Sequence, residues 1–300
     1  MEVPYNFWRD VISLLSRETQ LEIYHELPRD SLIRDASVRF QQRRYVELAI
    51  RGNEYRIQER SSDPYTVYEQ LNIWIYRHSD VPSRECPIIN EELFQHRIFL
   101  QRPRRIALIC LKDITNEMLY NWLLTENRIN VAFASALNGP LSEKMKNLIL
   151  RFCQKNLLET FSHECSHLSR DLLQSFVEAF QKPQFREIRV AIDPESLWFA
   201  QEILNLWKTS PKVLSGKVVI FHCLNQASCP EICAKPNKGS MDQAKKKELE
   251  KILKKFECRP IPGVEEMKIE EENGFKKYVY EQDNVQGPYP CLKKIHMYFC

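Results

Sequence analysis

Glycine is scarce in this sequence, and no two glycines lie closer than 11 positions apart. Loops that cradle a phosphate need clustered glycines, because their backbone turns sharply and approaches the ligand closely. The P-loop, the dinucleotide-binding fingerprint, the glycine-rich loop of protein kinases and the nucleophile elbow are therefore excluded. The seven glycines are Gly52, Gly139, Gly216, Gly239, Gly263, Gly274 and Gly287.

Long hydrophobic runs are also absent. The most apolar runs, such as 106–111 and 218–221, are strand-sized and far shorter than the roughly 20 residues of a membrane-spanning helix. The start, MEVPYNFWRD, has no basic region, apolar core or cleavage site of a signal peptide. We expect a cytoplasmic or nuclear protein with no membrane segment.

Charge of one sign does not dominate the chain, which has 43 basic and 40 acidic side chains. This near balance provides no long-range field for nucleic acid or anionic lipid, and neither is expected as a partner. At 43% hydrophobic residues, the 300-residue chain can bury a sizeable core as one elongated or two compact domains.

The ten cysteines are irregularly spaced between Cys86 and Cys300, which favours free thiols in a reducing compartment. One group combines histidine with cysteine but lacks the paired C-x-x-C knuckles of structural zinc sites. A loop with buried or free thiols is its other interpretation, and we predict no metal or other cofactor there. The group comprises His222, Cys223, Cys229, Cys233 and Cys258.

Between about 105 and 226, short apolar runs alternate with stretches of helical spacing. The runs begin near Ile106, Ile129, Leu158, Ile188 and Val218. Markers within the helical stripes recur at separations of 29, 28 and 28, which is typical of a stacked repeat. Start signals agree, since Thr115, Ser169 and Asp193, which precedes a proline, are suited to cap three of the helices. The markers are Leu119, Leu148, Phe176 and Leu204.

This pattern predicts an α/β fold of leucine-rich-repeat-like units, with short parallel strands on one wall and helices on the other. A non-repetitive doubly wound sheet is the alternative. The predicted order is a helical head over 1–45, an irregular connecting segment with a strand or two over 46–104, the repeat domain over 105–226, and a loop, helix and β-hairpin over 227–300.

His163, Glu164 and His167 match the H-E-x-x-H pattern, in which two histidines one helical turn apart bind zinc and the glutamate acts as base. That chemistry requires a helix, whereas the repeat predicts a strand and loop here. Four strand residues span roughly 13 Å, which is too far for both imidazoles to bind one zinc. In the competing interpretation, this segment and the helical stretches on either side of it form a single helix of about 40 residues. Glu178 and Glu187 stay open as third ligands.

The first residues, VPYNFWRDVISLL, resemble the start of an F-box, a helical module that docks a ubiquitin-ligase adaptor. Together with SFVEAFQKPQF and KKIHMYFC, they make the chain similar to nematode families of uncharacterised F-box-like proteins. The resemblance implies a substrate receptor with a ligase adaptor as its protein partner. Packing of the head onto the repeats is the alternative role for the docking residues, which are Val3, Pro4, Phe7, Val11, Ile12 and Leu15.

The sequence thus predicts a non-catalytic protein-interaction protein, with a zinc metallopeptidase using His163 and His167 as the alternative. A catalytic group assembled from distant residues stays possible, because such a group leaves no mark in the sequence.

Overall fold

The structure is a computed structural model, and it describes residues 26, 44–59, 68–76, 86–100, 103–126, 129–137, 139–163, 166–223, 243–256, 267–283 and 293–300. The six docking residues predicted in the head, from Val3 to Leu15, lie outside the described residues. The helical head therefore stays a prediction.

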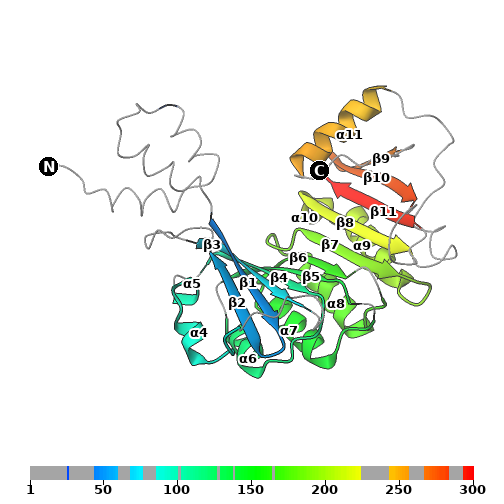
Figure 1. Cartoon of the computed structure of the whole chain (residues 1–300). Coiled ribbons are helices and arrows are strands. Elements are labelled where there is room, and N and C mark those ends of the chain that lie inside the picture. The colour runs from blue at the N-terminus through cyan, green and yellow to red at the C-terminus, as the bar shows by residue number, and fades with distance from the viewer. Residues whose placement is uncertain are drawn as a thin grey trace.

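The described strands form one sheet of 11, in the order β2-β1-β3-β4-β5-β6-β7-β8-β11-β10-β9 (Figure 1). From β1 to β8, leaving out β2, neighbouring strands are parallel and follow chain order. These parallel strands are β1 (Arg44–Arg51), β3 (Tyr68–Ile75), β4 (Arg105–Cys110), β5 (Asn130–Ser135), β6 (Leu158–His163), β7 (Glu187–Ile192) and β8 (Lys217–Cys223).

Four helices return the chain between successive parallel strands, and Figure 1 shows them along one face of the sheet, which we call the helix face. They are α6 (Glu117–Thr125), α7 (Glu143–Gln154), α8 (Arg170–Ala179) and α9 (Leu197–Thr209). Each presents apolar residues three or four positions apart to the sheet, as the sequence predicts. The five predicted strand runs are confirmed as β4 to β8.

The core lies between the helices and the sheet because alternate strand residues point to one side. Phe161 of β6 is fully buried, and its ring stacks on Phe133 of β5 at 5.3 Å between centroids. The same ring lies 4.5 Å from that of Phe176 in α8. Aromatic rings of adjacent strands and of a covering helix thus pack in one core.

The carboxyl-terminal part extends the same sheet. β10 (Phe275–Asp283) and β11 (Lys293–Phe299) pair antiparallel, which confirms the predicted hairpin, and β11 pairs with β8. The predicted helix is present as α11 (Gln243–Lys255), and β9 (Met267–Glu272) is an additional edge strand. α11 covers the face opposite to α6–α9, where it packs on a second apolar cluster containing Ile220, Tyr280 and Tyr298 (Figure 1).

The segment 46–104 holds more regular structure than the sequence indicates. Besides β1 and β3 it contains β2 (Glu54–Glu59), α4 (Glu91–Gln95) and α5 (Arg97–Leu100). β3 follows the alternating pattern and joins the sheet beside β4, so this segment continues the parallel array. The sequence indicates one or two strands here, whereas the described residues form three strands and two short helices. The breakers near 61–64 and 81–83 lie outside the described residues.

The helix starts differ in detail from the predicted ones. Asn116, not Thr115, caps α6 by accepting a hydrogen bond from the backbone of Leu119 at 2.9 Å. α9 begins at Leu197, one turn after Asp193, and Ser169 takes the cap position of α8 without a side-chain cap bond. A short helix, α10 (Pro211–Leu214), follows α9. No helix among the described residues is long and apolar enough to cross a membrane.

Candidate functional site: the open face of the sheet and its carboxyl edge

The face of β1 and β3–β7 that points away from α6–α9 is the first candidate site, and we call it the open face. Its residues are partly exposed, while their strand neighbours on the helix face are buried. Strand register places them in two rows across the sheet. One row is Ala49, Trp74, Ile109, Ala134, Ser162 and Arg189, and the other is Asn72, Ala107, Ala132, Thr160 and Glu187.

Small side chains occupy the centre of the open face. Ala132 and Ala134 of β5 lie in register with Thr160 and Ser162 of β6. Short side chains leave the strand surface flat, so a bound chain could approach it closely. The hydroxyl groups can donate or accept hydrogen bonds, which gives this centre a mixed polar and apolar character.

Aromatic side chains lie on the β3 side of the centre. The rings of Trp74 and Tyr76 stack with 6.0 Å between centroids. The indole Nε1 of Trp74 is buried and has no hydrogen-bond partner, which leaves a donor that a bound acceptor could satisfy. On the same strand, Gln70 donates a hydrogen bond of 2.7 Å to Asn72 Oδ1.

Charges on the open face are paired within the chain. Arg105 forms an ion pair of 2.9 Å with Glu159, which reaches over β5, and Arg189 pairs with Glu187 in its own strand. Paired opposite charges produce little field at a distance. The open face is therefore suited to a partner without a strong charge of one sign.

The second candidate site is the edge where the parallel strands end. His163 ends β6 and is fully buried, and its Nε2 lies 2.8 Å from Ser166 Oγ. The Ser166 hydroxyl donates to the carbonyl oxygen of Gly139 at 2.6 Å. Its only proton is used there, so Nε2 of His163 must carry a proton and donate to the hydroxyl. The imidazole is thus not a base toward Ser166, and the pair is not an activated nucleophile.

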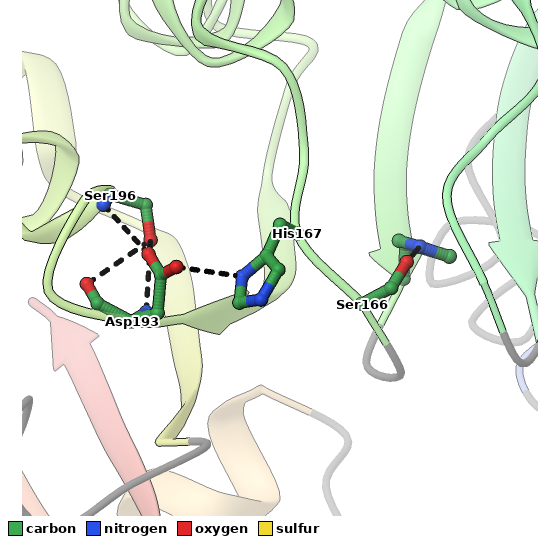
Figure 2. Close-up of polar contacts among 5 residues, drawn as sticks. Ser166, His167, Asp193 and Ser196 are labelled. Atoms are coloured by element: carbon green, nitrogen blue, oxygen red, sulfur yellow. Dashed lines mark hydrogen bonds and ion pairs between the residues drawn. The ribbon is translucent and has the colours of Figure 1, made fainter.

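His167 belongs to the same loop but points the other way, toward the loop after β7, as Figure 2 shows. Its Nδ1 lies 2.9 Å from Asp193 Oδ2, and the other carboxylate oxygen accepts the backbone N–H of Ser196 at 2.8 Å. Partial burial raises the pKa of Asp193, but the hydrogen bonds from Ser196 and the nearby His167 outweigh it, and the pKa is lowered overall. Asp193 closes the turn that leads into α9.

The histidine pair therefore lies on extended chain. β6 covers Leu158–His163, which confirms the predicted strand and contradicts a single helix through this segment. His163 contacts Ser166, whereas His167 contacts Asp193 of the next loop, so the two imidazoles are directed to different partners. Glu164 lies outside the described residues, within which no three His, Cys, Asp or Glu side chains gather as a metal site.

The second predicted metal candidate is divided between the faces of β8. Cys223 is buried in the core of the helix face, whereas its neighbour His222 points to the opposite side. Adjacent strand residues cannot easily converge on one ion. Cys229, Cys233 and Cys258 lie outside the described residues.

The open face is a site that the sequence reasoning did not name. Its signal was present in the alternate positions of β4 and β5, which, apart from Ile109, are small or polar between the buried apolar residues. Comparisons of the chain with protein-family models, curated proteins and solved structures return no match.

Proposed function

We propose that this chain is a non-catalytic protein-interaction protein that holds a protein partner on the open face of the sheet. The observation that supports this most is the one-sided covering of the parallel strands: among the described residues, the helices α6–α9 lie on one face and leave the residues around Ala134 partly exposed. Repeat proteins commonly bind partners on such extended surfaces.

We also propose that the units form a leucine-rich-repeat-like array. Consecutive strand-to-helix loops are bonded to each other, since Ser142 bonds to Asp113, Ser166 to Gly139 and His167 to Asp193, at separations of 29, 27 and 26 residues. The buried markers Leu119, Leu148 and Phe176 follow a similar period, although in α9 Ile203 is fully buried and Leu204 only partly. A contact between successive loops that recurs at similar separations supports stacking of equivalent units.

Lysines add a second recurring contact between units. Lys155, which follows α7, donates to the carbonyl oxygens of Leu124 and Glu126 at the end of α6. Lys217, at the start of β8, donates to Phe180 and Lys182 after α8. Both lysines satisfy the unpaired carbonyls at the end of an earlier helix, which favours helices in a fixed stack.

The resemblance of the first residues to an F-box supports a more specific role, that of a substrate receptor of a ubiquitin ligase. In this role the head docks the ligase adaptor through Val3, Pro4, Phe7, Val11, Ile12 and Leu15. The open face would then hold the protein to be modified.

The receptor role is tested by calorimetric titration of the purified chain with a purified ubiquitin-ligase adaptor. We expect saturable binding that Phe7→Ala and Leu15→Ala together abolish while circular dichroism is unchanged. The open-face variant Ala134→Arg should bind the adaptor normally. Absence of binding by the folded chain would exclude the receptor role.

The open face is tested separately by measuring how much of a candidate target protein binds to the immobilised chain. The wild type is compared with two variants. Ala134→Arg places a large charge at the centre of the open face, and we expect it to abolish capture of the target. Gln174→Arg makes the same change in charge on the exposed surface of α8 and should have no effect. Equal capture by both variants would remove the open face from the proposal.

A further inference from the structure

A groove of about 950 Å³ lies along α11 and is lined by residues of α11, by Tyr278 of β10 and by Cys300. Cys300 follows β11 and is held against β10, because its backbone N–H donates to the carbonyl oxygen of Lys276 at 2.8 Å. Three segments that are distant in sequence therefore build the groove.

The floor of the groove is apolar, and its side chains are held in place by packing. Ile252 and Tyr278 are both 5% exposed and belong to the cluster beneath α11. The hydroxyl group of Tyr278 donates to Glu248 Oε1 at 3.1 Å, which fixes both side chains. A small apolar side chain of a ligand could pack here beside charged groups.

The side of the groove that α11 forms carries a stripe of exposed lysines. Lys247, Lys251 and Lys254 follow the i, i+4, i+7 spacing of one helix face, and Lys255 lies beside the last of them. None of these four forms an ion pair with a described residue. The two acids of the lining offset only part of the charge, because there are two glutamates and four lysines.

A solvated charged helix is the ordinary interpretation of such a stripe, but here the lysines border a hollow with an apolar floor. We propose that this groove binds an acidic peptide segment of a protein partner, with carboxylates on the lysines and an apolar side chain toward Ile252 and Tyr278. The basic groove attracts an acidic ligand, and its apolar floor suits an apolar side chain of that ligand.

A membrane surface fits the groove less well. Helices that lie on lipid expose an apolar face to it, whereas Leu249, Ile252 and Leu253 of α11 are buried against the sheet.

The proposal is tested with a fluorescein-labelled peptide in which glutamate alternates with leucine, titrated with the purified full chain by fluorescence anisotropy. We expect saturable binding that added salt weakens. The triple variant Lys247→Ala, Lys251→Ala and Lys254→Ala should bind about tenfold more weakly, because exposed charge pairs each contribute little. A matched variant with Lys112→Ala, Lys182→Ala and Lys212→Ala loses the same charge from other exposed positions and should bind normally.

Alkylation of Cys300, followed by mass spectrometry, locates the bound peptide. The thiol lines the groove, so the peptide should slow its alkylation in the wild type. Equal weakening in both triple variants, or no protection of Cys300, would overturn the proposal. Tighter binding of phosphatidylserine vesicles or of single-stranded DNA, lost in the first triple variant alone, would also overturn it.

Discussion

His167 Nδ1 lies 2.9 Å from Asp193 Oδ2, in a contact between the loop before α8 and the loop after β7. The contact fixes the second histidine of the H-E-x-x-H sequence against the loop that follows the next strand of the sheet. Its imidazole is therefore directed away from Ser166, the partner of His163 (Figure 2). Two histidines that a zinc site would bring together instead stabilise different loop contacts.

The first prediction concerns zinc. We expect metal analysis of the purified chain to find no stoichiometric zinc, because binding would require both imidazoles to leave their present partners. His163→Ala should instead lower the free energy of unfolding by about 1–3 kcal/mol, since it removes a buried hydrogen-bonded group. Stoichiometric zinc in the wild type that is lost in both His163→Ala and His167→Ala would support the metallopeptidase alternative instead.

The second prediction concerns the turn at Asp193. Asp193→Ala should lower the free energy of unfolding by about 1 kcal/mol, because the backbone N–H of Ser196 loses its acceptor. Denaturant unfolding measures this, and Glu195→Ala, exposed in the same turn, should change little. The pKa of Asp193 is lowered in the folded chain. The Asp193 carboxylate therefore adds to the free energy of unfolding above the unfolded pKa of about 4, and this contribution is lost as pH falls further.

The third prediction concerns Lys217, which is 3% exposed and whose pKa burial lowers to about 8. The folded chain releases this proton at lower pH than the unfolded chain, where the pKa is 10.5. Between these values the unfolded state binds more protons at this site, so Lys217 makes the free energy of unfolding rise with pH. The buried thiols of Cys110 and Cys153, whose pKa burial raises, act in the opposite direction.

Unfolding of Lys217→Met across this pH range tests the assignment. The slope of the free energy of unfolding against pH should be less positive in this variant than in the wild type, whereas Lys212→Met, which changes an exposed lysine, should keep the wild-type slope. An unchanged slope in Lys217→Met would show that Lys217 does not contribute to the pH dependence.

The fourth prediction tests the two faces of β6. Phe161→Ala should lower the free energy of unfolding by about 3–5 kcal/mol, because the ring is fully buried between Phe133 and Phe176. Thr160→Val, which changes the preceding residue on the open face to one of similar shape, should change it by less than about 0.5 kcal/mol. Similar losses in both variants would mean that the open face is packed.

The sequence predicted much of the fold and little of the site. The runs from Ile106 to Val218 became β4–β8 because alternation of apolar residues is a local property of each segment. Breaker residues within 46–104 hid the strand pattern of β1–β3 in the sequence. The place of β1 and β3 in the sheet depends on pairing between separate segments of the chain. The open face was missed because its small residues are unremarkable one strand at a time.

The sequence by itself determined that strands and helices alternate and that residues 158–163 are extended, since side-chain period and chain geometry act within a few residues. Only the tertiary structure decided that β11 pairs with β8, that His167 faces Asp193 and that Cys300 borders α11. Those contacts join residues that are far apart in sequence. They depend on strand register and on which face of the sheet each helix covers, and neither is encoded in any single segment.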